Sequence, residues 1–116
     1  MKLTVYGIPT CSTVKKAVKW LSENGFEYDW VDLRKQPPSR EQLEEWMDVF
    51  GFKPMRNTSG GAYRKLGPQR NDYDSKDWLA AFSQEPMLLK RPIVLVDGKP
   101  ALVGFKADQY QAVLKS

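Results

Sequence analysis

The first third of the chain alternates between strand and helix patterns, and this order limits the possible folds. Lys2–Tyr6 is typical of a strand, and Phe26–Leu33 is typical of a second one, because apolar and polar residues alternate in both. A helix is expected between them, from about Cys11 to Asn24, with Gly25 ending it. Its apolar residues recur at helical spacing: Val14, Ala17, Val18 and Leu21.

Two strands joined by one helix and short connections are expected to pair in parallel. A right-handed crossover then places the turn Gly7–Thr10 at the carboxyl end of the first strand. Ligands of open α/β sheets bind at that end, so we expect the functional site there.

Cys11, the only cysteine, stands at the start of the expected helix. Unpaired N–H groups and the positive end of the helix dipole stabilise an anion there, so the thiolate form is favoured. The alternative is a small buried apolar residue. Lys15 follows one turn later, where its ammonium group either reaches the thiolate or is simply solvated.

The absence of histidine excludes several kinds of site. One Cys and no His cannot form a Cys-His pair, a Ser-His-Asp triad or a zinc site of the usual kinds, so no metal is expected. A lone cysteine also excludes an internal disulfide and suits a reducing compartment. No apolar stretch approaches the length of a membrane span, so we expect a cytoplasmic protein without a membrane partner.

The formal charge of +4 is spread over the chain, with 18 basic and 14 acidic residues. The densest basic groups, Lys15-Lys16 and Lys90-Arg91, are short. This pattern favours a solvated surface or a local anion site over a nucleic-acid groove. We therefore expect no direct nucleic-acid partner, and we expect a monomer.

The middle of the chain, about residues 39 to 88, is expected to be a helical insert within a single domain spanning residues 1 to 116. Ser39 followed by Gln42 predicts a capping box, and a further helix is expected to start near Asp74-Ser75 and to stop before Pro86. The expected inward residues are Leu43, Trp46, Met47 and Phe50 in the first helix and Trp78, Leu79 and Phe82 in the second.

A polar, glycine-rich segment, Arg56–Gly61, lies between these helices. It lacks the Gly-Lys-Ser/Thr ending of a Walker loop. It is interpreted as a turn, with the alternative that it lines the pocket of the thiol.

The last part of the chain predicts a hairpin followed by a helix. Ile93–Val96 and Ala101–Val103 are expected strands on either side of an Asp97–Pro100 turn, in which Asp-Gly is the hairpin signal. Ala107 or Asp108 can cap the closing helix, and its expected buried face is Tyr110, Val113 and Leu114.

The predicted fold class is therefore α/β, with a β-α-β half, a helical insert and a β-β-α half. A cysteine at the first helix start and an X-Pro before the third strand complete the order of a thioredoxin or glutaredoxin-like mixed sheet. Those proteins usually carry Cys-x-x-Cys, but Val14 stands at the fourth position here, so no resolving thiol is present.

Four segments of the sequence resemble the glutaredoxin-like arsenate reductase (ArsC) family, which includes Spx-type transcription regulators and YffB-type thiol reductases. YGIPTCSTVKKA is similar to its thiol motif, PPSREQLEEW to the start of its second helix, NTSGGAYRKLG to its insert loop and KRPIVLVDGKPALVGF to its hairpin. The resemblance covers essentially the whole chain and is strongest to the YffB branch.

The resemblance implies that Cys11 is the nucleophile, that Arg91 points toward its sulfur and that Pro92 follows a cis peptide bond. Thioredoxin-fold sites use such a proline to present backbone to a peptide or to glutathione, and cis bonds are essentially confined to proline. Without the resemblance, Arg91-Pro92 is interpreted only as a proline at the start of a strand.

Arsenate reductases of this family use three arginines around the oxyanion, and only Arg91 has a clear counterpart here. Asn57 occupies the second position, and Gly104 and Phe105 stand where the third is expected, with Lys106 beside them. Arsenate is therefore not the expected substrate.

We expect a single-cysteine thiol oxidoreductase whose mixed disulfide is resolved by an external thiol such as glutathione. Lys15, Asn57, Thr58 and Pro92 are the candidate residues of the pocket for glutathione or substrate. No tightly bound cofactor is expected. The alternative is an Spx-like regulator that docks on RNA polymerase.

Overall fold

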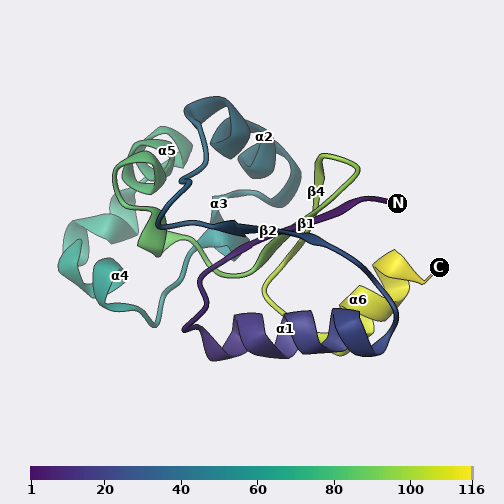
Figure 1. Cartoon of the computed structure of the whole chain (residues 1–116). Coiled ribbons are helices and arrows are strands. Elements are labelled where there is room, and N and C mark those ends of the chain that lie inside the picture. Colours follow the sequence, from purple (N-terminus) through teal and green to yellow (C-terminus); the bar gives the residue numbers. More distant parts are fainter. Residues whose placement is uncertain (116) are drawn as a thin grey trace.

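The computed structural model describes residues 1–115, which form a four-stranded mixed sheet flanked by helices on both faces (Figure 1). The strands are β1 (Leu3–Gly7), β2 (Asp29–Asp32), β3 (Ile93–Val96) and β4 (Lys99–Val103), in the spatial order β2-β1-β3-β4. β1 is parallel to β2 and antiparallel to β3, and β4 is antiparallel to β3. The predicted α/β class with a thioredoxin-like mixed sheet is confirmed.

α1 (Ser12–Glu23) and α6 (Ala107–Leu114) cover one face of the sheet, below it in Figure 1. Buried residues of β1, β3 and β4 meet buried residues of both helices in one cluster: Leu3, Val5, Ala17, Leu21, Val94, Leu102, Tyr110 and Leu114. A Cβ atom on Gly7 would lie 2.9 Å from the side chain of Val14. The lack of a side chain at Gly7 thus lets α1 pack closely on the end of β1.

The other face is covered by the helical segment that joins β2 to β3. Its elements are α2 (Arg40–Phe50), α3 (Phe52–Met55), α4 (Gly61–Lys65), the 3₁₀ turn η1 (Pro68–Asp72), α5 (Ser75–Gln84) and the 3₁₀ turn η2 (Pro86–Leu88). The buried Trp46, Trp78 and Phe82 pack with Tyr6 of β1 and Ile93 of β3. No helix described in residues 1–115 combines the length and apolar character needed to cross a membrane.

Two local structures that the sequence predicts, a helix cap and a hairpin turn, are present in the fold. Ser39 caps α2 through a capping box with Gln42, whose N–H donates to the Ser39 hydroxyl over 3.1 Å. In the β3–β4 turn, Asp97 and Gly98 have φ angles of 51° and 81°. Two consecutive positive φ values are those of a type I′ hairpin turn, which Asp-Gly favours.

The structure corrects four expectations. β4 begins at Lys99 and not at Ala101, because Lys99 and Pro100 pair with Val96 and Leu95 of β3. β2 is shorter than Phe26–Leu33, because the Phe26 ring stacks on Trp20 at 6.0 Å and its N–H donates to the Leu21 carbonyl. Lys106, not Ala107 or Asp108, is the N-cap of α6. Val113 is 44% exposed rather than part of the buried face.

Candidate functional site

Cys11 is the N-cap residue of α1, with φ −84° and ψ 122°. Its backbone N–H donates to the Ile8 carbonyl, and its own carbonyl accepts the N–H of Lys15 over 3.1 Å. The side chain is half-buried against the core that contains Ile8, Met55 and Leu89, and it makes no capping hydrogen bond. The thiol thus lies at the positive end of a 12-residue helix.

The Arg91-Pro92 peptide bond is cis, as the resemblance implied. Pro92 is buried at the start of β3, and its carbonyl accepts the N–H of Gly104 over 2.8 Å. β3 pairs with β1, the strand that leads to Cys11. The cis proline and the cysteine therefore both belong to the end of the sheet where β1 finishes.

The Arg91 guanidinium is held by Met87 of η2 and by Leu89, the residue after that turn. Its Nη1 donates to the carbonyls of Met87 and Leu89 over 3.1 and 3.0 Å. Its Nε is buried and has no acceptor within the described part of the chain. An unpaired buried donor costs about 1–3 kcal/mol, so this N–H is suited to an incoming anion. The expectation that Arg91 points toward Cys11 is not supported by any of these hydrogen bonds.

The polar loop after α3 is held against the segment that precedes the cis proline. The N–H of Asn57 donates to the Leu88 carbonyl over 2.8 Å, and the N–H of Lys90 donates to the Met55 carbonyl over 2.7 Å. Arg56 and Leu89 form an antiparallel bridge between these bonds. The backbone therefore brings the Asn57 loop beside the Arg91 segment, which sequence spacing alone did not show.

The Asn57 side chain depends on Gly60. Its Oδ1 accepts a 3.2 Å hydrogen bond from the Ser59 hydroxyl. A Cβ atom on Gly60 would lie 2.7 Å from the Asn57 Nδ2. Gly60 lies in the loop that the sequence offers as a possible lining of the thiol pocket, and its close approach to Asn57 depends on the fold of that loop. Thr58 is exposed.

Lys15 is exposed and forms no ion pair with any described residue, which fits the solvated alternative. Lys106 is exposed at the start of α6. The Phe105 ring packs edge-on against Tyr110, with the ring centroids 4.8 Å apart. The side chains of Lys15 and Lys106 are therefore exposed to solvent, whereas the Phe105 side chain packs against Tyr110.

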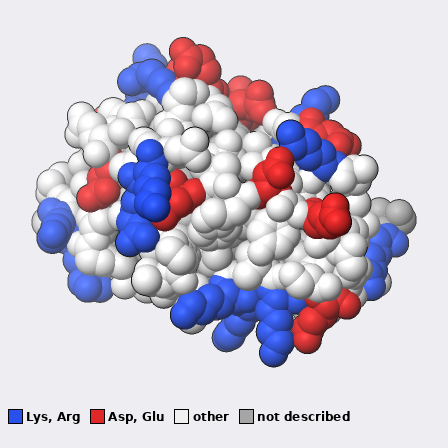
Figure 2. Space-filling view, in the orientation of Figure 1, with Lys and Arg blue, Asp and Glu red and all other residues white. Residues whose placement is uncertain are grey.

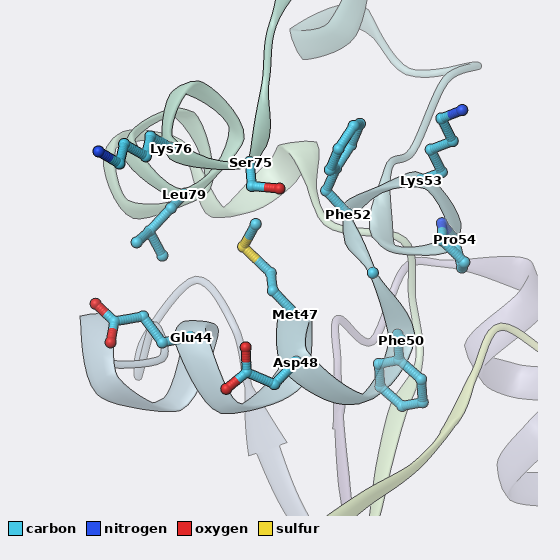
Figure 3. A pocket seen from close by; sticks show the side chains of 11 residues that line it. Glu44, Met47, Asp48, Phe50, Phe52, Lys53, Pro54, Ser75, Lys76 and Leu79 are labelled. Atoms are coloured by element: carbon cyan, nitrogen blue, oxygen red, sulfur yellow. The ribbon is translucent and has the colours of Figure 1, made fainter.

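Two surface hollows differ in their relation to the thiol. The first, of about 710 Å³, lies between α2, α3 and α5, with Met47, Phe52 and Leu79 among its apolar lining (Figure 3). Neither Cys11 nor Arg91 lines it. The second, of about 670 Å³, contains residues next to the site in sequence or by hydrogen bonding, namely Thr13, Lys90 and Gly104. Cys11 and Arg91 do not line the second hollow either, so it is a neighbour of the site and not the space around the thiol.

Comparison with known proteins gives one family and several relatives. The ArsC family matches residues 6–113. The Bacillus subtilis protein YusI, itself uncharacterised, is 39% identical over 115 residues, which is 96% of this chain and 97% of YusI. An arsenate reductase of Neisseria meningitidis is 30% identical, covering 97% and 98% of the two chains.

The chain is also similar to a transcription regulator and to a protein of known structure. The global transcriptional regulator Spx of Enterococcus faecalis is 29% identical over 97% of this chain and 86% of Spx. The solved structure of a YffB protein superimposes with a TM-score of 0.88 at 36% identity, covering 97% and 98% of the two chains.

Proposed function

Because the chain belongs to the ArsC family, we propose that it is a single-cysteine thiol oxidoreductase. Relatives named arsenate reductase support an enzyme of this general class. The observation that carries the proposal is the position of Cys11, half-buried and uncapped at the positive end of α1. Reactive cysteines occupy such partly exposed, electropositive positions.

The proposed reaction begins when the Cys11 thiolate attacks one sulfur of a substrate disulfide. The S–S bond of the substrate breaks, a mixed disulfide with Cys11 forms, and the other sulfur leaves as a thiolate that takes a proton from water. A glutathione thiolate then displaces the bound half of the substrate, and a second glutathione releases oxidised glutathione and restores the Cys11 thiolate. Two glutathione molecules supply the two electrons, because the chain has no second cysteine.

The neighbouring groups have distinct roles in this proposal. The buried, unpaired Nε of Arg91 supports a role in binding a carboxylate or an oxyanion. Asn57 and Thr58 contribute polar contacts from the adjacent loop, and Pro92 presents backbone to the peptide part of glutathione. Lys15, exposed one turn from Cys11, adds positive charge without a fixed contact.

Arsenate is a poor match for the proposed pocket. Burying an oxyanion without paired donors is costly, and Asn57 is neutral while the Phe105 ring packs against Tyr110. Gly104 has a φ of 75°, a conformation that side-chain-bearing residues rarely adopt, so an arginine at that position would be strained. Disulfides are thus the better substrate class.

The test is treatment with oxidised glutathione followed by mass spectrometry of the intact chain. We expect one glutathione adduct per chain, absent in Cys11→Ser and removed by excess thiol. Arg91→Lys keeps the charge but loses the planar guanidinium, so adduct formation should slow in that variant. A wild-type chain that stays unmodified where a glutaredoxin reacts would contradict the proposal.

A second candidate is docking on RNA polymerase, which the similarity to Spx regulators favours. Binding is measured with purified RNA polymerase and the wild-type chain, with an Spx protein as the positive control. Retention of the chain together with failure of the glutathione reaction would favour this regulator role over the enzyme.

A further inference from the structure

The solvent face of α1 carries three lysines among its first eight residues. Lys15, Lys16 and Lys19 are exposed, while the buried residues of α1 are Val14, Ala17 and Leu21. Figure 2 shows a cluster of basic side chains along the edge of the molecule where α1 lies in Figure 1, with acidic side chains at one end of the cluster. We call Lys15, Lys16 and Lys19 the lysine ridge.

This arrangement is unfavourable for the helix itself. Lys15 and Lys19 are four residues apart, and Lys16 and Lys19 are three apart, so like charges are neighbours on the surface. The first turn of α1 has no acidic residue to offset its positive dipole. The described residues provide no ion pair to any of the three lysines. Helix stability therefore does not account for the ridge.

The length of the ridge indicates the size of the partner. At about 1.5 Å per residue, Lys19 lies about 12 Å along the helix axis from Cys11. A fully extended tripeptide spans at most about 10 Å, and its central thiol reaches only half of that in either direction. Glutathione bound at Cys11 thus ends short of the Lys19 backbone and meets this lysine only where the side chain reaches back toward Cys11, so a ligand that runs along the whole ridge is longer than glutathione.

The acidic residue that follows the lysine ridge on α1, Glu23, indicates the kind of partner. Glu23 is exposed and stands four residues after Lys19, on the same side of the helix. A nucleic acid, with one charge at every nucleotide, would be repelled there, and three lysines are few for a phosphate groove. A protein can place acidic side chains opposite the three lysines and have no acidic side chain opposite Glu23.

We propose that the lysine ridge is the docking surface for an acidic segment of a protein whose disulfide is reduced at Cys11. This inference rests on the proposed function and adds the class of substrate. The acidic segment lies along α1, and its disulfide exchanges with the Cys11 thiolate as described above, with glutathione as the reductant. Complementary charge raises the association rate by about 10-fold to 1,000-fold at low salt.

The test uses peptides with one cysteine held as a pyridyl disulfide, long enough to reach Lys19. Three versions carry Glu, Gln or Lys on the side facing the ridge, and each rate is divided by the rate of the same peptide with 2-mercaptoethanol. This ratio removes differences in intrinsic reactivity among the peptides. Wild type should react about tenfold or more faster with the Glu peptide than with the Gln peptide at low salt, and the difference should vanish at high salt.

Two double variants distinguish an effect of the lysine ridge from an effect of the net charge of the whole protein. Lys16→Gln with Lys19→Gln should lose most of the preference for the Glu peptide while keeping the wild-type rate with the Gln peptide. Lys76→Gln with Lys99→Gln removes the same charge from exposed positions on α5 and the hairpin, and should keep the preference.

The possible failures are distinguishable. Equal, salt-independent rates for the Glu and Gln peptides, or an unchanged preference in the ridge variant, would overturn the ridge inference and leave the oxidoreductase proposal standing. No reaction with any peptide would overturn both. Stronger competition by a single-stranded oligonucleotide than by polyglutamate of equal charge would replace the acidic protein with a nucleic acid.

Discussion

The hydroxyl of Tyr110 donates a 2.7 Å hydrogen bond to the carbonyl of Gly104, inside the core between α6 and the end of β4. The N–H of Gly104 in turn donates to the carbonyl of Pro92. Two consecutive bonds therefore connect α6 to the cis proline of the candidate site.

Replacing Tyr110 with Phe should lower the free energy of unfolding by about 1–3 kcal/mol, because the buried Gly104 carbonyl loses its partner. Urea unfolding measures this loss. Tyr28→Phe is the matched control, because Tyr28 is only partly buried and water can reach it, and we expect less than about 0.5 kcal/mol there. Equal effects in the two variants would show that the Tyr110 bond contributes nothing specific.

The buried phenol of Tyr110 also leads us to expect a loss of folding stability at alkaline pH. Burial raises the pKa of Tyr110 above its ordinary value of 10.0, because the folded chain disfavours the phenolate. The unfolded chain releases this proton first, so the stabilisation is complete below about pH 10 and is lost progressively above it. The decline between pH 9 and about 11, measured by urea unfolding, should be steeper for wild type than for Tyr110→Phe, which has no phenol to titrate. Identical slopes would contradict the prediction.

The lowered pKa of Asp32 leads us to expect a loss of folding stability at acidic pH. The backbone N–H of Arg34 donates to its carboxylate over 2.9 Å, and this bond is the main cause that lowers the pKa of Asp32 below 3.8. The resulting stabilisation is present above about pH 4 and disappears as the pH falls through the lowered pKa. Asp32→Asn should therefore be less stable than wild type at pH 7, with the gap closing toward about pH 2.

The control for Asp32 is Asp29→Asn, since Asp29 forms only an exposed ion pair with Lys2. Exposed pairs contribute little, so this variant should remain close to wild type. A constant gap between Asp32→Asn and wild type over the whole acid range would mean that the carboxylate charge is not responsible.

Two adjacent glycines offer a paired test of the Asn57 loop. Gly60→Ala should displace the Asn57 amide, because the new Cβ would lie 2.7 Å from its Nδ2, and glutathione adduct formation at Cys11 should slow severalfold. In Gly61→Ala the nearest atom is the Arg64 Nη2 at 3.8 Å, an ordinary contact, so the rate should stay unchanged. Mass spectrometry against time provides both rates, and equal rates would remove Asn57 from the site.

Arsenate turnover coupled to glutathione should be weak in the wild-type chain. Arg91 supplies one permanent charge, and each missing charged contact costs about 1.5–3 kcal/mol, or roughly tenfold or more in affinity. Asn57→Arg should raise turnover, whereas Phe105→Arg should mainly destabilise the fold by removing the contact with Tyr110. Robust turnover by wild type at micromolar arsenate would show that other residues bind the oxyanion.

The features that the sequence predicted correctly are those with local causes. The capping box of Ser39 and Gln42 and the Asp97-Gly98 turn each depend on residues within a few positions, and the structure contains both. The helix that starts after Cys11 follows from its apolar spacing in the same way.

The short elements α3, α4 and η1 were not predicted, because four or five residues are too few to show helical periodicity. They are stabilised instead by contacts from distant residues. The buried Trp78 stacks with Phe52 of α3 and Tyr63 of α4, and Tyr73 packs edge-on against it. The orientation of Arg91 also depends on tertiary contacts, since the turn η2 supplies its acceptors.

The bridge between Arg56 and Leu89 has a consequence for how this fold can vary. Residues 57 and 88 are the two ends of the segment that holds α4, η1 and α5, and the N–H of Asn57 joins them by donating to the Leu88 carbonyl over 2.8 Å. An insertion among the exposed residues of η1 therefore lengthens a loop that is closed at its base, without lengthening the path from residue 88 to β3. The segment that carries the cis proline can thus keep its place beside β1 while the length of this loop changes.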